Sequence, residues 1–158
     1  MFNFLKGKKS ELSVTLDRLN GIYYLGETVN VNVDIQPKRE LELVGVRVQL
    51  RGLEGRAYKH TVMDSSYQNI PISTENTSWD YTEFFTGEER ALDETTLPGG
   101  TLRHYSFQMN IPSDASPSFV GEDLIVRWQI IVKLMGRYLE KEWLSETELS
   151  VQSPPKPT

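Results

Sequence analysis

The chain of 158 residues contains no cysteine. That absence excludes disulfide bonds, thiolate metal sites and cysteine nucleophiles, and it fits a reducing compartment. Histidine is nearly as scarce, because only His60 and His104 are present and their spacing is not that of metal ligands. No serine lies in a nucleophile-elbow sequence. We therefore expect no enzyme, no metal and no other cofactor, with both histidines facing solvent on strands.

Basic residues are too few for a nucleic-acid-binding protein. The 17 Lys and Arg are outnumbered by 22 Asp and Glu, which gives a net charge of −5, whereas DNA and RNA binding needs a basic face. Long apolar runs are missing too, since none approaches the roughly 20 residues that span a bilayer. The start of the chain, MFNFLKGKKS, lacks the order of a signal peptide and offers at most weak peripheral contact with an anionic membrane. We expect a cytoplasmic protein.

Period-two alternation dominates the sequence, and helical periodicity is nearly absent. Side chains alternate between the two faces of a strand, so such segments are buried on one face only. The pattern predicts strands at 12–16, 29–35, 44–52, 56–63, 77–87, 105–111, 124–134 and 138–151. Eight or so short strands without a helix indicate an all-β, two-sheet, immunoglobulin-like sandwich. We expect an N-terminal tip at 1–11, one domain at 12–151 and a Pro-rich tail at 152–158.

Two of these strands carry more detailed expectations. In the third, Val44, Val46, Val48 and Leu50 are expected to face inward, with Gly52 as the end of the strand. The segment 124–134 is apolar on both faces, which predicts a central strand. A polar loop is expected at 64–76, between the strands on either side of it.

Three segments, taken in order, resemble the N-terminal domain of the arrestin fold. They are Tyr24-Leu25-Gly26-Glu27-Thr28-Val29, where the family usually has proline at the Leu25 position; the strand 44–52; and 97–134, which contains a Pro-Gly-Gly turn and the loop Pro117-Ser118-Phe119. Proteins with this fold include the α-arrestins, the arrestin-fold subunit of retromer and bacterial sporulation-control proteins. The resemblance implies a sandwich of the arrestin N-terminal type, and a non-enzymatic protein-binding adaptor or scaffold.

Arrestins carry two such sandwiches in one chain, whereas this sequence shows one, of the N-terminal type. The resemblance therefore does not extend to the switch between two domains. The face that meets the second sandwich in the family would be uncovered here, and large apolar faces seldom stay exposed. This predicts a homo-oligomer.

Lys6, Lys8 and Lys9 precede the first strand of the sandwich. Arrestins have lysines at a comparable place, where they contact phosphates on a receptor tail that pairs beside the first strand. The resemblance thus implies a protein partner with a phosphorylated or acidic segment, bound by strand addition. The alternative is that these lysines protect an exposed edge strand from aggregation.

Two further groups of residues are candidate binding surfaces. Arg47 and Arg51 lie on one face of a strand and could bind an acidic partner, or could pair with acidic neighbours. The aromatic residues of the second group could grip a carbohydrate or peptide, form a dimer interface or belong to the core; they are Trp79, Tyr81, Phe84 and Phe85. A ligand-binding module is therefore the alternative function. The surrounding acidic residues lack the spacing of a calcium loop, which predicts a solvated face.

Overall fold

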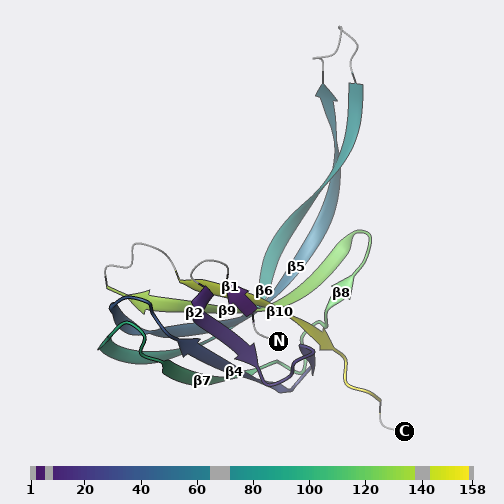
Figure 1. The fold of residues 1–158 in the computed structure, drawn as a ribbon. Helices are drawn as coiled ribbons and strands as arrows, with labels where there is room; N and C mark the ends of the chain where they lie inside the picture. Colours follow the sequence, from purple (N-terminus) through teal and green to yellow (C-terminus); the bar gives the residue numbers. More distant parts are fainter. Residues whose placement is uncertain (1–2, 6–8, 65–71, 138–142, 157–158) are drawn as a thin grey trace.

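The protein is built from two β-sheets that face one another (Figure 1). The computed structural model describes residues 3–5, 9–64, 72–137 and 143–156, and these residues form strands and turns but no helix. The strands are β1 (Asn3–Leu5), β2 (Lys9–Leu16), β3 (Ile22–Tyr24), β4 (Thr28–Ile35), β5 (Leu41–Asp64), β6 (Ile72–Leu97), β7 (Arg103–Asn110), β8 (Phe119–Val120), β9 (Leu124–Gly136) and β10 (Leu144–Gln152). The smaller sheet has the order β1-β2-β4-β7, and the larger has the order β3-β10-β9-β5-β6, with β8 beside β9.

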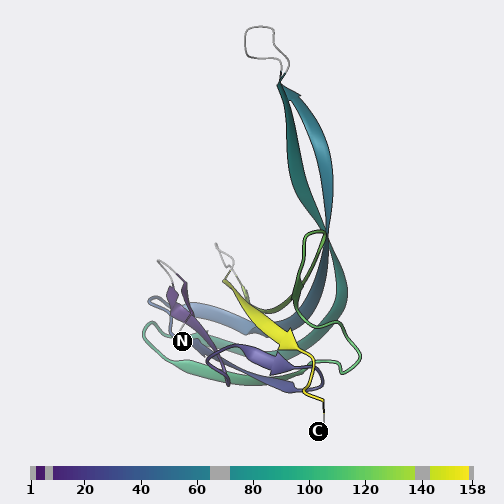
Figure 2. The ribbon, with the colours of Figure 1, turned by 90° about the vertical axis from the view of Figure 1, so that its right-hand side faces the viewer.

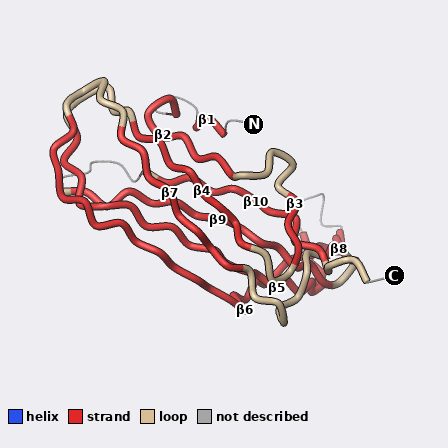
Figure 3. Tube along the Cα trace, turned by 90° about the horizontal axis from the view of Figure 1, so that it is seen from below, coloured by secondary structure: helices blue, strands red, loops and turns tan. Residues whose placement is uncertain are grey.

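Figure 3 shows the strands of the two sheets from below. The hydrophobic core is formed by side chains from the facing sides of these sheets. From β4 of the smaller sheet, Val31 and Val33 are fully buried, and from β9 of the larger sheet, Trp128 and Ile130 are fully buried. Burying a side chain of this size stabilises the folded state by roughly 1.5–3 kcal/mol. The predicted two-sheet sandwich is confirmed. The apolar residues that alternate along the sequence are the residues that form its core.

Strand β9 is central in the larger sheet, as the sequence predicts. It pairs with β5 on one side and with β10 on the other, both antiparallel. Gln129 and Ile131, which point to the outer face, are each only 9% exposed. Long side chains lie opposite both residues on the two neighbouring strands and cover this face: Arg51 and Glu148 beside Gln129, and Gln49 and Glu146 beside Ile131.

Two predictions about the larger sheet are wrong. Val44 does not face the core, because a register shift between Leu43 and Gly45 makes Leu43 the buried residue. Gly52 does not end its strand either: β5 continues for 24 residues and pairs with a β6 of 26 residues. The expected loop at 64–76 is correspondingly shorter, since β6 begins at Ile72.

Aromatic rings on β6 explain why β5 continues without a break through Gly52 and Gly55. A Cβ atom on Gly52 would lie 2.5 Å from the ring of Phe84, and one on Gly55 would lie 2.6 Å from the ring of Tyr81. The rings occupy the space that a side chain would need, so glycine here permits close packing and does not terminate the strand.

The distal parts of β5 and β6 project from the sandwich as a two-stranded ribbon (Figures 1 and 2). Pairing of β5 with β9 ends at Arg56, opposite Leu124. Beyond that point β5 pairs with β6 alone. We call residues 57–64 and 72–79 the arm.

Candidate functional site

A depression of about 420 Å³ lies on the outer face of the larger sheet, where the arm leaves the sandwich. Three neighbouring strands line it, each with side chains two positions apart: Arg51 and Leu53 from β5, Tyr81 and Glu83 from β6, and Arg127 and Gln129 from β9. The registers Leu53 with Arg127 and Gly55 with Tyr81 bring them together. The depression thus contains one residue from each of two predicted groups, Arg51 and Tyr81.

Both arginines of the depression are fixed by polar neighbours. Arg51 donates from Nε to Oε1 of Gln129 at 3.2 Å, and its guanidinium lies 3.9 Å from the carboxylate of Glu83. Arg127 donates to both carboxylate oxygens of Glu148, at 2.9 and 3.3 Å. Two hydrogen bonds raise the pKa of Arg127: the larger effect comes from the bond to Glu148 and the smaller from the bond to Tyr81. Each of the two guanidiniums is therefore held in orientation and paired with a glutamate.

These ion pairs are weak enough to exchange for a ligand. The side chains of Arg51 and Arg127 are 31% and 38% exposed, and those of Glu83 and Glu148 are 41% and 56% exposed. Exposed pairs of this kind contribute roughly 0–1 kcal/mol. A carboxylate or phosphate could replace either glutamate with little loss of stability.

Tyr81 gives the depression an apolar wall. Its ring lies over Gly55 and is 44% exposed. Rings that are packed on one side and open on the other are favoured at protein interfaces, because they add contact area at a low cost in conformational entropy.

The remaining predicted residues lie elsewhere. Arg47 is on the same face as Arg51, but its Nε lies 3.1 Å from Glu88, outside the depression. Phe84 and Phe85 pack against the buried ring of Trp128, with centroids 5.4 and 5.7 Å away. Trp79 is half-buried on the arm. Of the four aromatic residues, Tyr81 thus lies in the depression and Trp79 on the arm, whereas Phe84 and Phe85 pack against the core.

The chain's own N-terminal strand occupies part of the edge expected to receive a partner. Lys6 and Lys8 lie outside the described residues, and Lys9 begins β2. Strand β1 pairs antiparallel with β2, with Asn3 opposite Val14 and Phe4 opposite Ser13. A partner strand added at this edge of β2 would have to replace or extend β1.

Both histidines are exposed on strands, as predicted. His104 contacts Asp34 at 2.6 Å and Ser106 at 3.0 Å, and His60 contacts the ring of Tyr58. Within the described ranges, no group of three or more His, Asp or Glu side chains is arranged to hold a metal ion. Nor do those ranges contain a helix that is long and apolar enough to cross a membrane.

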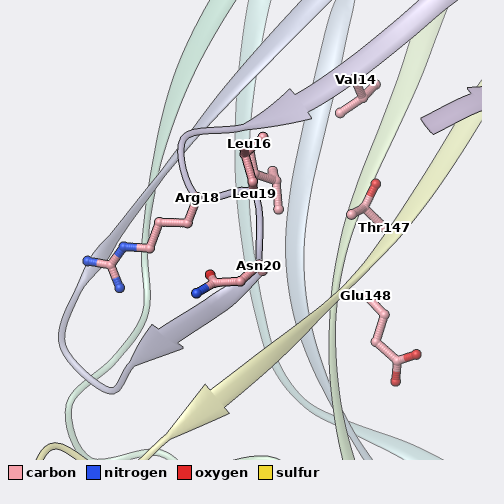
Figure 4. A pocket seen from close by; sticks show the side chains of 8 residues that line it. Val14, Leu16, Arg18, Leu19, Asn20, Thr147 and Glu148 are labelled. Carbon is pink, nitrogen blue, oxygen red and sulfur yellow. The ribbon is translucent and has the colours of Figure 1, made fainter. Parts of the chain in front are cut away.

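A second, smaller depression of about 180 Å³ lies between β2 and β10 (Figure 4). Leu16 and Leu19 lie on one side of it and Thr147 on the other, while the side chain of Arg18 extends away from the leucines. Arg18 forms an ion pair with Glu27. This depression has less than half the volume of the one beside Tyr81, which makes it the weaker candidate.

The motif around Gly26 has a structural explanation. Gly26 has φ of +88°, a conformation that L side chains rarely adopt. Glu27 accepts a hydrogen bond from the backbone N–H of Tyr24 at 2.6 Å and pairs with Arg18. The hydrogen bond from Arg18, and then that from Tyr24, lower the pKa of Glu27. These contacts fix the turn between β3 and β4.

A buried tyrosine holds the preceding turn in place. Tyr23 is fully buried and donates from its hydroxyl to Asp17 at 2.6 Å. Burial, and then this hydrogen bond, raise the pKa of Tyr23. Burial acts to raise the pKa of Asp17, but hydrogen bonds from Tyr23 and Asn30 outweigh it, so this pKa is lowered. The hydrogen bond between Tyr23 and Asp17 has a structural role: at neutral pH the tyrosine keeps its proton and the aspartate is ionised.

The Pro-Ser-Phe loop has a structural role too, because hydrogen bonds connect it to β10 and β9. The N–H of Ser118 donates to the carbonyl of Val151 at 2.7 Å, and the N–H of Val151 donates to Oγ of Ser118 at 2.9 Å. Trp128 donates from Nε1 to the carbonyl of Ser116 at 2.9 Å. Gly100 of the Pro-Gly-Gly turn has φ of +83°, which confirms that this glycine serves a tight turn.

These turns and loops lie within residues 12–151, which match the family described as Arrestin (or S-antigen), N-terminal domain. The chain belongs to the arrestin family. A search of curated proteins finds no match. Among solved structures, the arrestin-type chain is similar to Spo0M, the sporulation control protein from Bacillus subtilis, with a TM-score of 0.61 and 15% identity. The match covers 91% of this chain and 49% of Spo0M, so the chain spans about half of that protein. At this identity the likeness shows the fold.

Proposed function

We propose that this arrestin-type chain is a non-enzymatic protein-binding module that acts in the cytoplasm as an adaptor or scaffold. The observation that carries the proposal is the depression in which Arg51, Arg127 and the exposed ring of Tyr81 meet. Paired strands of the larger sheet position all three residues, which limits the entropy lost when a partner binds. Membership of the arrestin family supports a binding role for the module.

The charges of the depression favour an acidic or phosphorylated partner segment. Arg51 and Arg127 lie on neighbouring strands two register positions apart. Such diagonal neighbours are about 7–8 Å apart, close to the spacing of alternate residues in an extended chain. An extended segment could therefore place two acidic groups against the two guanidiniums, each able to form bidentate hydrogen bonds. Tyr81 would contact an apolar side chain of the same segment.

Two other binding modes follow from the sequence. Family resemblance assigns the basic edge at Lys6, Lys8 and Lys9 to a phosphorylated or acidic tail. The exposed ring of Tyr81 is also a surface on which a sugar could stack, which keeps a carbohydrate ligand as the alternative for the same depression. The experiment below separates the three.

Neutralising the depression is expected to abolish partner binding. Wild type, Arg51→Gln with Arg127→Gln, and Lys8→Gln with Lys9→Gln are used as baits in lysate of the source cells, and captured proteins are quantified by mass spectrometry. We expect the proteins enriched by wild type to be reduced about a hundredfold or more with the arginine variant, since two charge-assisted contacts of ~1.5–3 kcal/mol each are lost.

The matched control is Lys38→Gln with Arg39→Gln, which removes two exposed charges from the turn before β5 and should leave capture unchanged. Loss of capture with the lysine variant alone would place binding at the N-terminal edge and contradict the depression as the site. Capture that is blocked by a free sugar and insensitive to the arginine variant would favour the carbohydrate alternative.

A further inference from the structure

The arm lacks the support that a pair of strands needs. Residues 57–64 pair with β6 on one side, and the described part of the chain supplies no strand on their other side. An isolated two-stranded ribbon is at best marginally stable in water, whereas three or more strands give independent stability. An additional strand would therefore stabilise the projecting ribbon that Figures 1 and 2 show.

The outer edge of β6 can receive that strand. β6 is the terminal strand of the larger sheet, so alternate backbone N–H and C=O groups along it point away from β5. Between 72 and 83 the sequence contains no proline, lysine or arginine, the residues that usually protect an edge. The charged residues of this segment are all acidic, namely Glu75, Asp80 and Glu83, so an added strand must keep its own carboxylates away from them.

A second copy of β6 fits this edge in one favourable register. The register with β5 shifts at Gly52 and Leu53, opposite Phe85 and Glu83, so the regular part of β6 ends at residue 83. Antiparallel overlap of 73–83 with its own copy places the two-fold axis at residue 78. Trp79 then faces Thr77 of the other copy, Asp80 faces Asn76, and Tyr81 faces Glu75.

Charge separates this register from those with an axis at Trp79 or Asp80, and the Asp80–Asn76 contact separates it from an axis at Thr77, which would also keep the carboxylates apart. With the axis at residue 78, each carboxylate faces an uncharged side chain, and Asp80 can accept a hydrogen bond from the amide of Asn76. An axis at Trp79 would place Glu83 opposite Glu75, and an axis at Asp80 would place Asp80 opposite itself. Like charges directly opposite one another destabilise a sheet.

We propose that two copies of this chain pair through the outer edges of their β6 strands, antiparallel about Ser78. The product is a four-stranded ribbon, β5-β6-β6-β5, with a two-fold axis and a self-complementary interface of the kind found in symmetric dimers. This interface adjoins the depression and shares Tyr81 and Glu83 with it, and it assigns the predicted self-association to the arm.

The first test is a disulfide across the axis. Opposed residues in an antiparallel pair have Cβ atoms about 4.5–5.5 Å apart, near the disulfide range. The chain has no cysteine, so Ser78→Cys supplies the sole thiol. Under mild oxidation we expect most of this variant to become a covalent dimer on non-reducing gels. Thr61→Cys, an exposed position on β5, is the control and should remain monomeric. Equal cross-linking of the two variants would overturn the proposal.

The second test reverses the Asp80–Asn76 contact. Asn76→Asp creates two pairs of facing carboxylates per dimer and is expected to weaken association about tenfold, measured by sedimentation equilibrium. Adding Asp80→Asn should restore it by exchanging the two side chains. Within one chain Asn76 faces His60, so the first substitution leaves the arm without a new repulsion. A wild type that is monomeric at its highest soluble concentration, or a double variant no better than the single one, contradicts the register.

Discussion

Replacing Trp128 by alanine is expected to lower the free energy of unfolding by about 3–5 kcal/mol, the range for large aromatic residues in cores. The side chain is fully buried in β9, its ring contacts Phe84 and Phe85, and its Nε1 donates to Ser116. Truncation would leave a cavity beneath the base of the arm and an unpaired carbonyl in the Pro-Ser-Phe loop. Because whole domains are stable by only about 5–15 kcal/mol, this change would remove much of the total.

Urea unfolding followed by far-ultraviolet circular dichroism measures the effect. Trp128→Phe separates its two causes, since it keeps a ring but removes the indole donor, and it should have a clearly smaller effect than alanine. Leu102→Ala, at a side chain that is 59% exposed, is the control for a surface position. A loss of less than ~1 kcal/mol in Trp128→Ala, the size of an ordinary substitution, would show that Trp128 is not the centre of the core.

Replacing Val31 by aspartate is expected to cost at least ~4 kcal/mol and to leave little folded protein at room temperature. Val31 is fully buried in β4, opposite Leu16 of β2 and Phe107 of β7. A carboxylate there would have apolar neighbours on both adjacent strands, so it would be buried either as an unpaired charge or as a protonated acid without a partner.

The neighbouring position provides the control. Asn32 points to the opposite face, where its Oδ1 accepts a hydrogen bond from Ser106 that a carboxylate could also accept. Asn32→Asp should therefore change stability by about 0.5 kcal/mol or less, as surface substitutions usually do. Thermal unfolding of both variants makes the comparison, and equal losses would contradict the assignment of β4 faces.

The strands with one buried face could be predicted because alternation depends on local sequence alone. Val31 and its neighbours in β4 follow period two without interruption. The sequence also predicts strands at 56–63 and 77–87, but not that the first of them continues without a break from the strand before Gly52. Gly52 and Gly55 are typical of strand ends, and the cross-strand rings of Phe84 and Tyr81 that accommodate them come from about 30 residues away. The prediction for Val44 is wrong because the register shift between Leu43 and Gly45 changes which side chains point to the core, while the amino-acid composition of the strand gives no sign of the shift.

The depression was predicted only in part, for a related reason. Arg51 and Tyr81 were recognised as unusual in their own segments, but their proximity depends on the register of β5 with β6. Arg127 was not recognised. Its signal was present in the sequence, as a charged side chain between the buried Val126 and Trp128, which places it on the outer face. Its position beside Leu53 follows only from the pairing of β9 with β5.

The central claim is that the outer face beside Tyr81 binds a protein partner, and photo-cross-linking in the source cells tests it most directly. A photoreactive phenylalanine derivative replaces Tyr81, and in a control it replaces the exposed Leu102 at the start of β7. We predict covalent adducts between position 81 and a small set of other proteins, in addition to the adduct with a second copy of this chain, and none from position 102. The adducts with other proteins are expected to be lost when Arg51→Gln and Arg127→Gln are added. No adduct with another protein at position 81, or the same adducts from both positions, would contradict the claim.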